Sequence, residues 1–339
     1  CYSLDAIGEY ELDERKTQYE GTLDQLYNQD FKTFIEYNRQ DTALLFKLDQ
    51  KLRFLDLAND LAHDNTVLLP TTMGAVAVTE QAIINEAHQL GMVVPNRTRR
   101  GEEENTQAAG AYVAQPKKGM HDWVGAIDIN SLYPSAIRAL NMGSETVVGQ
   151  LRPIMTDSYL NEKRDAGKTF TDSWDGLFAS LEYTAVMEMQ AGTEITVDWA
   201  NGESTVHTGA ELWKMLFDCN QSWTLSANGT IFTYEKKGII PGLLERWYAE
   251  RQELQAKKKE ATDTEDIAFW DKRQLVKKIN LNSLYGAILN PGCRFFDKRI
   301  GQSTTLTGRS IAKHMDAFTN ECIMGVYDHT GEAIIYGDT

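Results

Sequence analysis

Two short strings of this sequence decide how the rest of it is interpreted. They read Asp128-Ile129-Asn130-Ser131-Leu132-Tyr133-Pro134-Ser135 and Lys278-Ile279-Asn280-Leu281-Asn282-Ser283-Leu284-Tyr285-Gly286, and they begin about 150 residues apart. The first string offers a carboxylate that can bind a metal ion, and the second offers a cation that can bind phosphate. Phosphoryl transfer from a triphosphate needs both groups, because it depends mainly on positioning and on neutralising charge.

The pattern D-x-x-S-L-Y-P-S followed by K-x-x-x-N-S-x-Y-G resembles motifs A and B of family B DNA polymerases. A third string, Ile335-Tyr336-Gly337-Asp338-Thr339, resembles the beginning of motif C, which the family writes Y-G-D-T-D-S. The matches follow one order along most of the chain and are most similar to the T-even phage group. The resemblance implies a second motif C aspartate beyond Thr339, so we expect a polymerase fragment that is inactive by itself.

The resemblance implies a metal site made from motifs A and C. Asp128 and Asp338 would be metal ligands and catalytic residues, and the backbone carbonyl of Ile129 would be a further ligand. Two Mg²⁺ ions, with Mn²⁺ as an alternative, would hold the attacking and leaving oxygens. From the residues alone, Asp128 could instead cap the helix that follows it, and Gly337-Asp338 could be an ordinary turn.

The resemblance also implies nucleotide-binding residues, with Lys278 a catalytic residue as well. They are Ser131, Leu132, Tyr133, Arg251, Lys278, Asn282 and Tyr285. Tyr133 would lie beneath the incoming sugar and exclude a 2′-hydroxyl, although core packing is the alternative. Lys278 and Tyr285 share one helical stripe with Asn282, and a solvated lysine is the alternative there. The pattern expects a lysine four residues after Arg251, where Gln255 stands, so either the register slips or Lys257 substitutes.

A helix predicted over residues 29–63 contains a further short match. Tyr37 and Asp41 are four residues apart and would share a helical face. The pair resembles the third motif of the family's 3′-5′ exonuclease, whose other carboxylates we expect upstream of Cys1. We therefore expect an exonuclease remnant without editing activity.

These matches predict an α+β multidomain chain: a partial polymerase right hand, with an antiparallel palm sheet and two-helix fingers, after the tail of an RNase H-like exonuclease domain. The expected segments are 1–63 (end of the exonuclease domain), 64–115 (connector), 116–235 (palm with motif A and a strand-rich insertion), 236–288 (fingers with motif B) and 289–339 (palm ending inside motif C). Strands are expected at 124–128 and 333–336. Turn signals at Asn201-Gly202 and Asn228-Gly229 predict hairpins.

Composition sets the remaining bounds. The 339 residues are 42% hydrophobic, enough for two or three domains. The four cysteines form no C-x-x-C pair, which argues against zinc and disulfides, and no apolar run is long enough to span a membrane. The net charge of −15 argues against nucleic-acid binding, but residues 246–278 are locally rich in lysine and arginine.

The resemblance implies primer-template DNA and deoxynucleoside triphosphates as partners, a sliding clamp for the full-length enzyme, no membrane, and a cytoplasmic location, in the host if the source is a phage. Two rival interpretations stay open. One is a non-catalytic half of a split polymerase that binds DNA or nucleotide. The other is an unrelated acidic protein with chance matches.

Overall fold

A computed structural model describes residues 2–96, 111–152, 194–219 and 221–339. The chain divides into two compact units, Cys1–Met73 and Gly74–Thr339. The first unit is helical, and the second combines helices with one antiparallel sheet. The mixture of helices and antiparallel strands confirms the α+β class.

The first unit consists of α1 (Leu4–Leu12), α2 (Leu23–Gln29), α3 (Phe31–Leu52), α4 (Phe54–Asn65) and the short η1 (Leu69–Met73). The single helix expected over 29–63 is therefore wrong. Arg53 separates α3 from α4 because its backbone is left-handed, with φ at 57°. No glycine or proline marks this break, so the sequence carried no signal for it.

The second unit contains α5 (Ala75–Gln89), α6 (Leu132–Ala139), η2 (Ser144–Thr146), α10 (Gly209–Trp213), η3 (Lys214–Asp218), α11 (Ile239–Glu260), α12 (Thr264–Ile288) and α13 (Lys298–Met324). Its strands are β1 (Val147–Arg152), β2 (Glu194–Trp199), β3 (Ser204–Thr208), β4 (Trp223–Leu225) and β5 (Thr230–Thr233). The strands form one sheet in the order β3-β2-β1-β5-β4, and all neighbours are antiparallel.

Both expected hairpins are present. Asn201-Gly202 connects β2 to β3, and Asn228-Gly229 connects β4 to β5. Gly202 and Gly229 have φ values of 89° and 80°, which glycine adopts without a steric penalty. Part of the expected strand-rich insertion, residues 153–193, lies outside the described residues.

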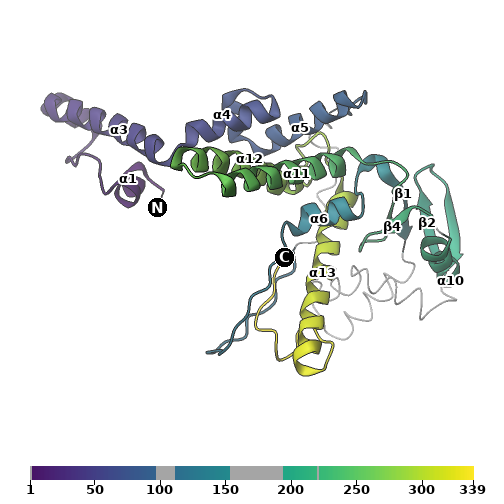
Figure 1. Ribbon diagram of the computed structural model, residues 1–339. Coiled ribbons are helices and arrows are strands. Elements are labelled where there is room, and N and C mark those ends of the chain that lie inside the picture. The colour runs from purple at the N-terminus through teal and green to yellow at the C-terminus, as the bar shows by residue number, and fades with distance from the viewer. Residues whose placement is uncertain (1, 97–110, 153–193, 220) are drawn as a thin grey trace. The chain divides into compact units, whose positions relative to one another are not determined.

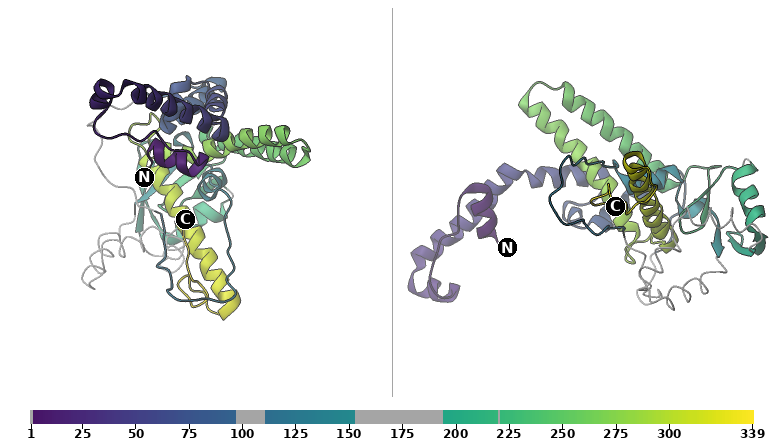
Figure 2. Two further views of the ribbon diagram at one scale, coloured as in Figure 1. Left: turned by 90° about the vertical axis from the view of Figure 1, so that its left-hand side faces the viewer. Right: turned by 90° about the horizontal axis from the view of Figure 1, so that it is seen from below.

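Helices α11 and α12 form an antiparallel pair that projects from the rest of the second unit (Figure 1, Figure 2). Helix α11 begins at Ile239, and Pro241 lies in its first turn, where the missing amide N–H of proline costs no intrahelical hydrogen bond. Asp263 caps α12 by accepting a hydrogen bond from the backbone of Glu265, and the helix begins at the next residue, Thr264. The turn between the helices is accordingly short.

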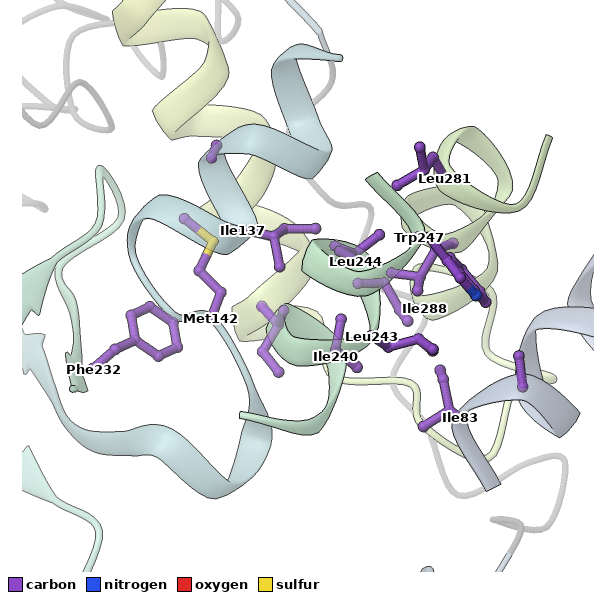
Figure 3. Close-up of a cluster of buried hydrophobic side chains, with 14 residues drawn as sticks. Ile83, Ile137, Met142, Phe232, Ile240, Leu243, Leu244, Trp247, Leu281 and Ile288 are labelled. Atoms are coloured by element: carbon purple, nitrogen blue, oxygen red, sulfur yellow. The ribbon is translucent and has the colours of Figure 1, made fainter. Parts of the chain in front are cut away.

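The main core of the second unit lies where α5, α6, β5, α11, α12 and α13 converge (Figure 3). Its members are Ala82, Ile83, Ala136, Ile137, Met142, Phe232, Ile240, Leu243, Leu244, Trp247, Leu281, Leu284, Ile288 and Ile300. Two ion pairs reinforce α5 against this core: Glu86 with Arg246, at 2.6 Å, and Glu80 with Arg294, at 3.3 Å. Helices α6 and α12, which carry the sequence motifs, therefore pack into the same hydrophobic core.

Motif A and motif C do not form the strands that we expected. Residues 124–128 have no assigned strand, and Val124 and Ile127 are 63% and 65% exposed. Residues 333–336 are also irregular, and one antiparallel bridge joins Val113 to Asp338. A strand needs a neighbouring backbone to accept and donate its hydrogen bonds, and the described residues give 124–128 no such neighbour.

Asn141 ties the loop after α6 to the loop before α11. It is fully buried and left-handed, with φ at 54°. Its Nδ2 donates to the carbonyls of Thr233, at 2.7 Å, and Lys236, at 2.8 Å, and its Oδ1 accepts from the backbone of Gly238, at 3.0 Å. One side chain thus satisfies three backbone groups.

We expect Asn141→Ala to lower the free energy of unfolding by about 3 kcal/mol, because buried backbone groups lose their partners. Urea denaturation of both proteins measures this difference. Asn201→Ala is the matched control, since Asn201 lies in an exposed turn. Equal losses in the two variants would contradict the structural role of Asn141.

Candidate active site

The three sequence strings meet at the side chain of Tyr133. Its ring stacks on that of Tyr285, with centroids 4.5 Å apart and planes 22° apart. Its hydroxyl donates a hydrogen bond to Oγ1 of Thr339, at 3.1 Å. Motif A on α6, motif B on α12 and the beginning of motif C therefore contact one another, although about 200 residues separate the first from the last.

Tyr285 is fixed on its other side by α13. Its hydroxyl hydrogen bonds to the hydroxyl of Thr305, which is buried on that helix. Burial is the main reason that the pKa of Tyr285 is raised, so the phenol keeps its proton across the neutral range. The paired tyrosine rings therefore form a neutral, aromatic surface.

Backbone hydrogen bonds to segment 112–117 hold the motif C string in place. Thr339 donates its amide to the carbonyl of Tyr112, at 3.1 Å, and its hydroxyl accepts from the amide of Tyr112, at 3.0 Å. The amide of Ala114 donates to the carbonyl of Gly337, at 2.8 Å. Segments 112–117 and 335–339 thus run antiparallel, joined by one bridge between Val113 and Asp338.

The two expected metal ligands are both accessible. Asp128 is exposed and has no hydrogen-bond or ionic partner among the described residues, whereas Asp338 is exposed and accepts from the hydroxyl of Tyr336, at 2.9 Å. Their carboxylate oxygens, with the carbonyl of Ile129, are the hard donors that Mg²⁺ prefers. Within residues 2–96, 111–152, 194–219 and 221–339, however, no three acidic, histidine or cysteine side chains gather as a ready-made site.

The expected stripe on α12 is present. Lys278 and Asn282 are exposed, while Tyr285 is half-buried against Tyr133. The neighbouring Lys277 turns the other way and pairs with Glu250 of α11, at 2.6 Å. In the described part of the chain, Lys278 has no ionic partner, so its charge is available to a ligand.

The other expected phosphate cations have protein partners. Arg251 is half-buried, and its Nε donates to Oε1 of Gln274 on α12, at 3.4 Å. Lys257, the alternative to Gln255, lies 5.0 Å from the ring centroid of Trp270. The structure thus gives Lys257 an aromatic partner and keeps Arg251 between the two helices.

Ser131 and Leu132 lie at the start of α6: Ser131 is the residue at the cap position, and Leu132 is the first residue of the helix. Ser131 is left-handed, with φ at 54°, and its hydroxyl donates to Oδ1 of Asn130, at 3.3 Å. Asp128 forms no cap for α6, because the residue at the cap position is Ser131 and its side chain accepts no capping hydrogen bond. The alternative interpretation of Asp128 as a helix cap is therefore wrong.

In the first unit, Tyr37 and Asp41 lie on one face of α3, as expected. The ammonium of Lys16 donates to the Tyr37 hydroxyl, at 3.0 Å, and to Oδ2 of Asp41, at 2.7 Å. The hydrogen bond to Asp41 is the main cause of a raised pKa of Lys16. The sequence pattern placed the pair correctly and missed its lysine partner.

Sequence reasoning also missed Asp316 of α13, which lies against Gly337 behind motif C. The residue is 8% exposed, and its Oδ2 has no hydrogen-bond partner among the described residues. Burial raises the pKa of this carboxyl. Asp316 belongs to none of the sequence motifs. The spacing of residues along α13 could at most have placed it on the buried face of that helix.

The raised pKa of Asp316 predicts a specific pH dependence of stability. The folded state binds a proton on the Asp316 carboxyl more readily than the unfolded state does. The stability that this protonation contributes is therefore fully present below the unfolded pKa and is lost as the pH rises through the folded pKa. We expect Asp316→Asn to be more stable than the unsubstituted chain at pH 7, and the difference to close below about pH 4. Thermal melts at several pH values measure it. A difference that does not change with pH would contradict the assignment.

Comparison with known proteins agrees with this arrangement. The family model described as DNA polymerase family B matches residues 70–339. The chain belongs to this family. The polymerase family B match includes all three strings that meet at Tyr133, and it begins after the segment with Tyr37 and Asp41.

Individual relatives point the same way. The chain is 24% identical to the DNA-directed DNA polymerase of Escherichia phage RB69 and 23% identical to that of Enterobacteria phage T4, over 100% of this chain in both cases. It is 25% identical to DNA polymerase 2 of Aeropyrum pernix over 99% of this chain and 33% of that polymerase. The chain spans 37% of the length of each phage relative. These matches support the T-even-like resemblance within family B.

The described helices of this family B chain include none with both the length and the apolar character needed to cross a membrane. Among the described cysteines, Cys219 and Cys322 are exposed and Cys293 is buried.

Proposed function

We propose that this chain forms the nucleotide-binding and part of the catalytic region of a DNA-directed DNA polymerase. The reaction transfers a nucleotidyl group from a deoxynucleoside triphosphate to the 3′-hydroxyl of a primer on a template. The observation that carries the proposal is the convergence of motifs A, B and C on Tyr133. Membership of polymerase family B supports it.

Asp128 and Asp338 would hold divalent ions, with the Ile129 carbonyl as a further ligand. The accessible carboxylates fit Mg²⁺, or Mn²⁺ in its place, because both ions take oxygen ligands. Two such ions would neutralise the triphosphate and orient the attacking oxygen. The described residues supply two carboxylates, and a further aspartate is what we expect after Thr339.

Lys278 and Arg251 would bind the triphosphate from the helix pair, and the exposed Asn282 lies on the Lys278 stripe. Ser131, Leu132 and Tyr133 would line the sugar and base, with Tyr285 stacked on Tyr133. A planar ring beneath the sugar leaves no room for a 2′-hydroxyl. The aromatic pair therefore favours deoxynucleotides.

The same proposal extends to the domains. Residues 236–288 would be the fingers, because α11 and α12 form an antiparallel pair that bears Arg251 and Lys278. Residues 116–235 and 289–339 would be palm, 64–115 the connector, and 1–63 the end of an exonuclease domain. A sliding clamp would serve the full-length enzyme, and the host cytoplasm would be its location.

Primer extension with Mg²⁺ and all four deoxynucleotides tests the proposal. The chain as printed is compared with one extended through the rest of motif C and the domain that follows. We expect DNA synthesis by the extended chain and none by the printed one. Synthesis by neither chain, with both folded by circular dichroism, would overturn the polymerase proposal and favour a non-catalytic half that binds DNA or nucleotide.

A further inference from the structure

Helix α13 passes directly behind the ring of Tyr133 at Gly308. A Cβ atom added to Gly308 would lie 2.7 Å from Cε1 and 3.1 Å from Cδ1 of Tyr133, and 3.5 Å from Cδ2 of Leu132. Carbon atoms in contact are normally about 3.5 to 4.0 Å apart. Only glycine therefore allows the ring to lie where it does.

The ring of Tyr133 has little freedom to move away. The ring stacks on Tyr285, whose hydroxyl is hydrogen-bonded to Thr305 of α13. The hydroxyl of Tyr133 donates a hydrogen bond to Thr339. A methyl group at position 308 would push the ring edge and disturb these contacts together. The contact falls mainly on this ring, because the two heavy atoms nearest to the added Cβ both belong to Tyr133.

We infer that Gly308 is a positioning residue for sugar selection: the bare helix backbone sets the depth of the Tyr133 ring, and this depth sets how strongly a 2′-hydroxyl is rejected. The inference rests on the proposed function, since it assigns Tyr133 to the sugar. Gly308 itself would touch no nucleotide. Its effect passes through the ring.

The test is the ratio of kcat/KM for a deoxynucleotide to kcat/KM for the matching ribonucleotide, measured in the chain extended beyond Thr339. We expect Gly308→Ala to change this ratio roughly tenfold, because small displacements of positioning groups have large kinetic effects. Tyr133→Ala is the positive control and should lower the ratio. An unchanged ratio in Gly308→Ala would overturn the inference.

Gly301→Ala is the matched control. Gly301 is also buried on α13, but a Cβ there would meet Leu289 and no tyrosine. This variant should lose stability and keep the ratio of the unsubstituted protein. A change in Gly301→Ala equal to that in Gly308→Ala would mean that general disturbance of α13 is the cause, and would overturn the role of the Tyr133 contact.

A double-mutant cycle provides a readout that does not depend on synthesis. Gly308→Ala should lower the urea midpoint of the protein with Tyr133, and should lower it much less in a Tyr133→Ala background, because the clash is absent there. An equal loss in both backgrounds would overturn the inference. If the unsubstituted extended chain makes no DNA, the proposed function fails and so does the assigned role. If it makes DNA and the ratio is unchanged in Gly308→Ala, only this inference fails.

Discussion

Asp128→Asn in the chain extended beyond Thr339 is expected to incorporate nucleotides about a thousandfold more slowly than the unsubstituted chain, because an amide cannot replace a charged metal ligand. Asp128 is exposed and makes no interaction with other described residues. The substitution should therefore leave the unfolding midpoint unchanged. Single-nucleotide primer extension, with Mg²⁺ varied, measures the rate and the metal dependence together.

Asp122→Asn is the matched control for this experiment. Asp122 lies in the same irregular segment, is exposed, and is assigned no role in the site. It removes the same charge six residues earlier and should leave the rate and the Mg²⁺ requirement unaltered. Equal rates in Asp128→Asn and Asp122→Asn would show that Asp128 is not a metal ligand.

The spacing of Lys278, Asn282 and Tyr285 was sufficient to predict their arrangement. Side chains at i, i+4 and i+7 share a face whenever the segment is helical, and this segment has no residue that interrupts α12 before Ile288. Hairpins at Asn201-Gly202 and Asn228-Gly229 were predictable for a similar reason, since those dipeptides suit the turn directly. Residue spacing within a helix and the residue types of a turn were therefore enough to predict the α12 stripe and the two hairpins correctly.

Contacts between distant segments could not be predicted in this way. The fit of Gly308 against Tyr133 depends on the packing of α13 against α6, and neither residue signals the other in the sequence. Asp316 behind Gly337 is a second example, because only the packed structure shows that its carboxyl is buried. Such positions stay hidden in the sequence because their neighbours lie far along the chain.

The expected strand at 124–128 failed for a different reason. Val124 and Ile127 have the residue types of a buried strand, yet both are exposed. Strand propensity describes how a residue fits a half-buried sheet surface, and it does not supply the neighbouring strand. The same limitation applies to 333–336, where the backbone bonds to segment 112–117 form one bridge and no continuous ladder.

The second large effect is expected for Lys278→Ala, which should lower kcat/KM for a deoxynucleotide about a hundredfold in the extended chain, because a positioned cation stabilises the charge that develops on the triphosphate. Lys278 is exposed on α12, without an ionic partner in the described residues, whereas the adjacent Lys277 is bound to Glu250. Lys278 can thus direct its charge toward a ligand, while Lys277 stabilises the pair of helices α11 and α12.

Arg273→Ala separates a local role of Lys278 from the loss of charge alone. Arg273 lies on the same helix, is exposed, and has its guanidinium 4.7 Å from the ring centroid of Phe269. Both variants remove one positive charge from α12, so their effects on weak, salt-dependent attraction of DNA should be similar. Only Lys278→Ala should raise the KM for the nucleotide strongly at fixed salt, and Lys278→Arg should recover part of the loss. Equal kinetic losses in Lys278→Ala and Arg273→Ala would mean that α12 attracts nucleotide through its total charge, and that the position of Lys278 has no special part in catalysis.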